Sequence, residues 1–151
     1  MKTPEETEAL GARLAAARPP DGEQPLILYL TGDLGAGKTT LARGFARACG
    51  IAAQVRSPTY TLVNVHEAPS FTLVHLDLYR LREPGELEHL GLREWARPGC
   101  LWLIEWPERA GGLLPPADLT VQLTAGPDAH HADIFMGSAT GRAWLEGIRS
   151  S

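Results

Sequence analysis

The stretch Gly32-Asp33-Leu34-Gly35-Ala36-Gly37-Lys38-Thr39 matches the pattern G-x-x-x-x-G-K-[ST] at every fixed position. One residue, Thr31, separates it from Leu26–Leu30, a run that is apolar on both faces, as a central strand of a parallel sheet is. The residues after it predict a helix over about 38–48, which Gly50 ends. In this strand–loop–helix context the glycines allow several backbone N–H groups to converge on a phosphate at the start of a helix.

The polar side chains that close this loop have separate expected roles. We expect Lys38 to reach the β- and γ-phosphates of a nucleotide, Thr39 to hold Mg²⁺ and Thr40 to donate to the α-phosphate. Lys2 and Lys38 are the only lysines among the 14 basic residues, so the loop keeps a compact ammonium in a chain that otherwise uses Arg. The alternative is a glycine-rich turn without a ligand, which the agreement of strand, loop, helix and spacing disfavours.

Carboxylates end two further apolar runs of the chain. Glu105 follows Cys100–Ile104, and Asp77 follows Phe71–Leu76. Ligands of open α/β sheets bind beyond the carboxyl ends of the strands, so both acids are candidates for the site. We expect Glu105 to hold Mg²⁺ directly or through water, and Asp77 to orient the attacking water or assist at the metal. The alternative for each is a carboxylate that caps a helix or forms a turn.

Length and composition limit the class of protein. A chain of 151 residues fits one domain, 1–151, and its 44% hydrophobic and 21% charged residues are close to globular averages. The longest apolar runs have five residues, far fewer than the roughly 18 that span a bilayer. The start of the chain lacks the apolar segment of a signal peptide, so we expect a cytoplasmic protein. The net charge of −4 disfavours strong nucleic-acid binding by the chain alone.

The remaining patterns predict an α/β fold: a three-layer α/β/α sandwich with a mixed, partly parallel sheet. Cys49 and Cys100 are expected to be separate buried thiols. The predicted elements are a helix over 4–17, strands over 26–30 and 100–105, a helix over 38–48, hairpins of 59–65 with 71–77 and of 119–123 with 132–136, short helical segments over 84–96, and a terminal helix over 140–149 that buries Trp144, Leu145 and Ile148.

Three short patterns leave alternatives open. The hydroxyl-rich residues 56–61 lie where many nucleotide switches sense the γ-phosphate, and they fit a strand-entry turn equally well. Trp106-Pro107 fits either a rigid rim or a helix stop with a packed indole. His130-His131 is typical of a solvated loop, because no third metal ligand stands at helical or hairpin spacing.

Four blocks of the chain, in this order, resemble the signature segments of the TsaE (YjeE) family, the small bacterial ATPases of tRNA threonylcarbamoyladenosine biosynthesis. The blocks are residues 32–40, 57–63, 75–81 (H-L-D-L-Y-R-L) and 104–108 (I-E-W-P-E), within a resemblance that spans about residues 3–117. It implies a P-loop NTPase-like fold, ATP hydrolysis with Mg²⁺, and partnership with TsaD and TsaB, which make the modified adenosine at position 37 of tRNAs.

The resemblance also implies roles for individual residues, and it places the N-terminal stretch Thr3–Thr7 near the nucleotide. Lys38, Asp77 and Glu105 would act in catalysis, and Thr39 and Glu105 would ligate Mg²⁺. The expected nucleotide-binding residues are Asp33, Leu34, Gly35, Ala36, Gly37, Lys38, Thr39, Thr40 and Glu108.

The sequence also bears on three other classes of nucleotide-binding protein. A small GTPase needs N-K-x-D and D-x-x-G, and neither pattern is present. A small P-loop kinase that phosphorylates a small-molecule acceptor shares the phosphate-binding loop and stays the alternative. A module that binds ATP only as a structural ligand needs no water-positioning acid, so the two strand-end carboxylates favour chemistry.

Overall fold

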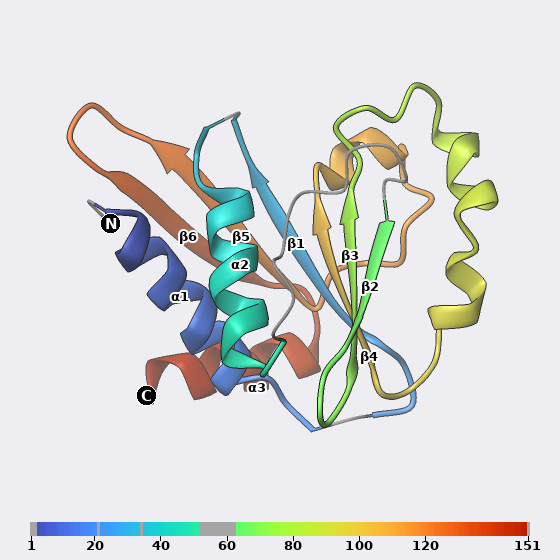
Figure 1. Cartoon of the computed structure of the whole chain (residues 1–151), viewed down its shortest axis with the longest axis horizontal. Coiled ribbons are helices and arrows are strands. Elements are labelled where there is room, and N and C mark those ends of the chain that lie inside the picture. Colours follow the sequence, from blue (N-terminus) through green and yellow to red (C-terminus); the bar gives the residue numbers. More distant parts are fainter. Residues whose placement is uncertain (1–2, 21, 34, 52–62, 151) are drawn as a thin grey trace.

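The computed structural model describes residues 3–20, 22–33, 35–51 and 63–150. Within these residues the chain forms a six-stranded sheet of order β2-β3-β4-β1-β5-β6 (Figure 1). β3, β4, β1 and β5 pair in parallel, and the edge strands β2 and β6 are antiparallel to their neighbours. The strands are β1 (Leu26–Gly32), β2 (Val63–Glu67), β3 (Thr72–Asp77), β4 (Cys100–Glu105), β5 (Leu119–Ala125) and β6 (His130–Met136).

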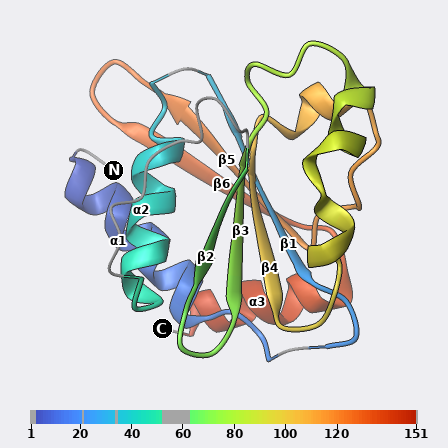
Figure 2. The ribbon, with the colours of Figure 1, turned by 45° about the vertical axis from the view of Figure 1, so that its right-hand side comes forward.

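Helices of two kinds cover the two faces of the sheet (Figure 2). The α-helices are α1 (Pro4–Ala16), α2 (Lys38–Ala48) and α3 (Ala139–Arg149), and they share one apolar cluster with the sheet. A second cluster on the opposite face includes residues of the 3₁₀ helices η1 (Pro84–Leu90) and η3 (Pro107–Ala110), with η2 (Leu92–Trp95) packed against it. The predicted α/β fold with a mixed sheet is confirmed, and its second outer layer consists of 3₁₀ helices.

The ends of the α-helices follow the chemistry of the sequence. Thr3 caps α1, because its hydroxyl accepts a hydrogen bond of 3.1 Å from the Glu6 N–H, and Pro4 occupies the first turn. Ser138 caps α3 in the same way through the Gly141 N–H. The Trp144 indole N–H of α3 donates to the Leu14 carbonyl of α1 at 2.8 Å, which fixes these two helices to each other.

Most predicted elements are confirmed within the described residues. Both hairpins form, although residues 59–62 of the first lie outside the described part of the chain. Trp144 and Ile148 are buried as expected, and Leu145 is partly buried. Cys49 and Cys100 are free and buried, and burial raises the pKa of the Cys49 thiol to about 11. No helix in the described ranges is long and apolar enough to cross a membrane.

The helices α1 and α2 approach each other closely at two glycines. A Cβ atom at Gly44 would lie 2.2 Å from the Glu8 carbonyl oxygen, and one at Gly11 would lie 2.2 Å from the Leu41 carbonyl oxygen. Both clashes are with backbone atoms, so no side-chain rotation relieves them. The crossing of α1 over α2 therefore requires glycine at both positions.

We predict that Gly44→Ala lowers the free energy of unfolding by about 2–3 kcal/mol, because the two helices must separate to admit the methyl group. In an uncrowded helix interior the same change is stabilising by roughly 0.5–1 kcal/mol. Gly85→Ala is the control, since a Cβ there meets nothing within 4 Å and should change stability by less than about 0.5 kcal/mol. Urea denaturation of the two variants and the wild type measures the difference, and equal stability of Gly44→Ala and wild type would contradict the close crossing.

Candidate phosphate-binding and metal site

The topology of the sheet brings the predicted site residues to one edge. β1 leads into the phosphate-binding loop and then α2 on one face, whereas β4 leads into η3 on the other face. β1 and β4 are neighbours, so the loop lies at the point where the connections diverge, the usual position of a ligand in an open α/β sheet. Glu105 pairs in register with Leu30 of β1 on one side and with Asp77 of β3 on the other.

The backbone of the loop is shaped for an anion. Gly35 and Gly37 have φ angles of 78° and 104°, a region that side chains disfavour. Gly37 is also the N-cap of α2 and, having no side chain, supplies no side-chain acceptor to the first turn of the helix. A cavity of about 280 Å³ opens above them, lined by Gly35, Gly37, Lys38, Thr39, Thr40, Asp77, Tyr79, Glu105 and Trp106. The loop, two strand ends and an aromatic wall thus enclose a space for phosphate groups.

Lys38 is folded back onto the loop. Its ammonium donates to the carbonyl oxygens of Gly32 at 2.5 Å and Asp33 at 2.9 Å, and it lies 4.0 Å from the centre of the Trp106 ring. The side chain is only 6% exposed, and this burial lowers the pKa of Lys38. The carboxylates around it, Glu105 foremost, act in the opposite direction. The Lys38 ammonium is therefore held by two uncharged carbonyl groups and an aromatic ring, contacts that a phosphate oxygen can replace.

Glu105 is the buried carboxylate of the site, at 2% exposure. Its Oε1 accepts a hydrogen bond of 3.2 Å from the Thr39 hydroxyl, and its Oε2 lies 2.7 Å from Nε2 of His75. A hydroxyl and a carboxylate oxygen side by side at a phosphate-binding loop are the hard oxygen donors that Mg²⁺ prefers. The residues present therefore fit a magnesium ion between Thr39 and Glu105.

Asp77 lines the same cavity in a different environment. It is partly exposed, and its Oδ1 accepts a hydrogen bond of 3.1 Å from the Tyr79 N–H. This contact is the turn-forming role that the sequence left open for Asp77. The turn bond employs one carboxylate oxygen, so Asp77 combines a local structural role with a position at the cavity.

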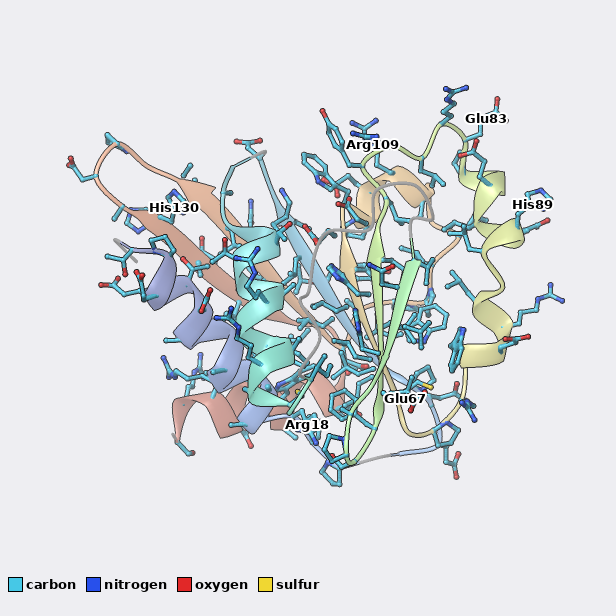
Figure 3. All side chains as sticks on the ribbon, viewed as in Figure 1. Arg18, Glu67, Glu83, His89, Arg109 and His130 are labelled. Atoms are coloured by element: carbon cyan, nitrogen blue, oxygen red, sulfur yellow. The ribbon has the colours of Figure 1, made fainter. Side chains whose placement is uncertain are left out.

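An aromatic wall closes the side of the cavity, and the sequence indicated only its Trp106 part, as one of two alternatives. Trp106 has a φ of 59°, the single non-glycine residue with positive φ in the described part of the chain. Its ring lies 4.9 Å from that of Tyr79, and the Arg109 guanidinium lies 5.3 Å from the Tyr79 ring centre. Figure 3 shows Arg109 near the carboxyl ends of β3 and β4. The Trp106 indole lines the cavity and also packs against the second apolar cluster, so both interpretations of Trp106-Pro107 stay open.

A second cavity of about 350 Å³ adjoins the first and shares Gly35, Gly37 and Thr40 with it. Thr3, Pro4 and Thr7 of the N-terminal segment line one side, and Gly126–His130 of the β5–β6 turn line another. Figure 3 labels His130 on this hairpin, across from α1. The two adjoining cavities are together called the groove over the loop.

Two further predicted site residues, Ala36 and Glu108, are not among the residues that line the two cavities. Ala36 is buried beneath the loop, with its N–H donating to the Asp33 carbonyl at 3.1 Å. Glu108 is exposed and does not line either cavity, although its charge acts on Lys38. Leu34 and residues 57–62 lie outside the described residues. Arg43 and Arg47 of α2 face α1, where both approach the Glu8 carboxylate.

Comparisons with known proteins agree with this arrangement. The family model described as "Threonylcarbamoyl adenosine biosynthesis protein TsaE" matches residues 1–133. The chain belongs to the TsaE family. It is 42% identical over 120 residues to the tRNA threonylcarbamoyladenosine biosynthesis protein TsaE of Haemophilus influenzae, covering 80% of this chain and 76% of that protein. The TsaE of Bacillus subtilis is 39% identical over 125 residues, covering 83% of this chain and 75% of that protein.

Comparison with a solved structure shows that the similarity extends over nearly the whole chain. The crystal structure of YdiB from Bacillus subtilis has a TM-score of 0.74 and 29% sequence identity, and covers 99% of this chain and 91% of that chain. This TsaE-family chain therefore has the P-loop NTPase-like fold that the sequence predicted. The covered length includes α3 and the β5–β6 hairpin, which lie beyond the stretch with recognised motifs.

We predict that Lys38→Met weakens binding of ADP by roughly 10- to 100-fold, because each charged hydrogen bond to a phosphate contributes about 1.5–3 kcal/mol. Methionine keeps an unbranched apolar stem beside Trp106. Arg47→Met is the matched control: it removes a cation from the same helix, where that cation pairs with Glu8, and it should leave the affinity within about threefold. Isothermal titration calorimetry measures both variants. Unchanged ADP affinity in Lys38→Met would contradict the assignment of the loop.

Proposed function

We propose that this protein is a Mg²⁺-dependent ATPase that supports biosynthesis of N6-threonylcarbamoyladenosine in tRNA by acting on the complex of TsaD and TsaB. Membership of the TsaE family supports the pathway. One observation supports the chemistry above all others. The Thr39 hydroxyl and the Glu105 carboxylate meet at 3.2 Å beside the phosphate-binding loop, in a cavity that Lys38 also lines.

The groove above the loop divides naturally between the parts of ATP. The triphosphate would occupy the first cavity, where the start of α2 and the Lys38 ammonium supply positive charge. The nucleoside would occupy the second cavity, between the N-terminal segment and the β5–β6 turn. Thr40 lines both cavities, which suits its expected contact with the α-phosphate.

The chain's own residues would direct hydrolysis once the nucleotide is seated. Thr39 and Glu105 would hold a magnesium ion, which neutralises charge that develops on the phosphate oxygens. Asp77 would accept a hydrogen bond from a water molecule and turn its oxygen toward the γ-phosphorus. The new bond would form between that oxygen and phosphorus as the bond to the β–γ bridging oxygen breaks. One proton of the water would leave to solvent through its hydrogen bond to Asp77, and ADP and inorganic phosphate would be the products.

A partner would complete the set of cations at this site. Rapid phosphoryl cleavage in P-loop proteins usually needs a second cation besides the loop lysine, often an arginine from another protein. Among the described residues Lys38 is the one cation that lines the first cavity. Arg109 lies over the Tyr79 and Trp106 rings, and Arg43 and Arg47 face Glu8. We therefore propose slow hydrolysis by the isolated protein and faster hydrolysis on contact with TsaD and TsaB.

Phosphate release measured without and with TsaD and TsaB tests this function. We expect at least tenfold stimulation by the two partners, since an arginine supplied by a partner can contribute up to about 10³–10⁵-fold. Glu105→Gln keeps the size of the side chain but removes its charge, and should reduce the stimulated rate by about 10²-fold or more. Equal rates with and without the partners would contradict action on TsaD and TsaB. Transfer of phosphate to a small acceptor in place of water would favour a kinase.

The substitution Asp77→Asn should distinguish the structural role of this residue in its turn from its proposed role in orienting water. The asparagine carbonyl oxygen still accepts the Tyr79 N–H, so the turn and the thermal stability should be preserved, whereas the charge that orients water is lost. We expect a hydrolysis rate lower by about 10²-fold or more, with the Kd for Mg-ADP changed less than about threefold. Rapid-quench kinetics and calorimetry measure the two quantities. Loss of Mg²⁺ dependence in Asp77→Asn but not in Glu105→Gln would reverse the roles of the two acids.

A further inference from the structure

His75 is a fully buried polar residue that the functions described so far do not use. It lies on β3 at 0% exposure, two residues before Asp77. On β4 it pairs in register with Leu103, so Glu105 lies two residues further along the neighbouring strand and on the same face of the sheet. Burying an imidazole is costly unless a hydrogen bond compensates for the lost hydration, and His75 makes that bond to Glu105.

Within the described residues, the His75 side chain has one hydrogen-bond partner, the Glu105 carboxylate. Ionised Glu105 can only accept, so Nε2 of His75 donates to Oε2 across 2.7 Å. The other ring nitrogen, Nδ1, is buried and has no hydrogen-bond partner in the described part of the chain. The imidazole is therefore not tied into a wider network that would explain its presence structurally. Its hydrogen-bond partner is Glu105, the buried carboxylate of the site.

We infer that His75 is a positioning residue that sets the orientation of Glu105 for metal binding; the inference rests on the proposed magnesium site. The His75 ring is buried on β3, an interior strand of the sheet, and holds Oε2, so the carboxylate cannot rotate freely about its last side-chain bond. Oε1 then stays beside the Thr39 hydroxyl at 3.2 Å. A ligand oriented in advance loses less conformational freedom when it binds a cation, which raises metal affinity.

Three substitutions of His75 separate this role from simple core packing. His75→Gln keeps an N–H donor at the same number of bonds from Cβ as Nε2 of histidine. In His75→Asn the amide ends one bond short of Glu105, and His75→Leu has no donor. His66→Leu is the matched control. His66 is a partly buried imidazole on β2 that pairs with Leu73, and its Nε2 has no described partner. It lies close enough to His75 for the two charges to interact, but it makes no described hydrogen bond to Glu105.

The measurement is the Kd of a non-hydrolysable ATP analogue, determined by calorimetry once with excess Mg²⁺ and once with EDTA. Loss of a residue that orients a metal ligand costs about 10- to 100-fold in metal affinity. We expect His75→Leu and His75→Asn to raise the Kd in Mg²⁺ about tenfold or more, with the Kd in EDTA within about threefold of wild type. His75→Gln and His66→Leu should stay within about threefold of wild type in both conditions. A packing defect would instead raise both Kd values.

The outcomes distinguish this inference from the function on which it rests. If wild type gains affinity from Mg²⁺ and His75→Leu and His75→Asn gain equally, the positioning role is overturned while the metal site stands. It is also overturned if His75→Gln is as weak as His75→Asn, or if His66→Leu is weakened to the same extent. If Mg²⁺ does not improve binding to the wild type, the proposed metal site is overturned and the inference with it. Should His75→Leu fail to fold, the comparison of Gln with Asn decides.

Discussion

The parallel pairing of β1 with β4 is the constraint on which the rest of the site depends. Its register places Glu105 opposite Leu30, two residues before the glycine that opens the phosphate-binding loop. A shift of one residue would turn the Glu105 side chain to the opposite face of the sheet, away from Thr39. The pairing is secured by apolar burial, since β4 is buried along its whole length and lies between β1 and β3. The geometry of a polar site is thus set by the packing of apolar strands.

The two carboxylates at this edge share a register position but not an environment. Glu105 is enclosed and hydrogen-bonded on both oxygens, by Thr39 and His75, whereas Asp77 is partly exposed and accepts a backbone N–H. An enclosed carboxylate with a fixed orientation suits a metal ligand, and a more exposed one at the cavity suits contact with water. The division of roles under the proposed function follows from where β4 and β3 lie in the sheet, with β4 central and β3 one strand further out.

Local patterns in the sequence predicted the elements and the two acids, because strand ends, caps and a glycine-rich loop are each encoded in a few adjacent residues. The contact of His75 with Glu105 and that of Tyr79 with Trp106 were not predicted, because each joins segments that are distant along the chain. His75 meets Glu105 only through the β3–β4 register, and Trp106 meets Tyr79 only because β3 and β4 end at the same edge. An ionisable residue two positions before Asp77, in a run that is otherwise apolar except for Thr72, was the one local signal for His75. The 3₁₀ layer was anticipated only as short helical segments, since Gly91 interrupts it.

The balance of charge in the first cavity bears on how a nucleotide would enter. Its described lining holds one cation, Lys38, and two carboxylates, Asp77 and Glu105. Lys38 is already engaged by two carbonyl oxygens and an aromatic ring, and burial opposes its charge. A triphosphate without a counter-ion would therefore meet two negative side chains near a single, occupied positive one. A triphosphate that carries a divalent cation reverses this balance, because Glu105 becomes a ligand and Lys38 can exchange its neutral contacts for an anion. Under the proposed function, the same carboxylates that would serve the chemistry also select the metal-bound form of ATP over the free form.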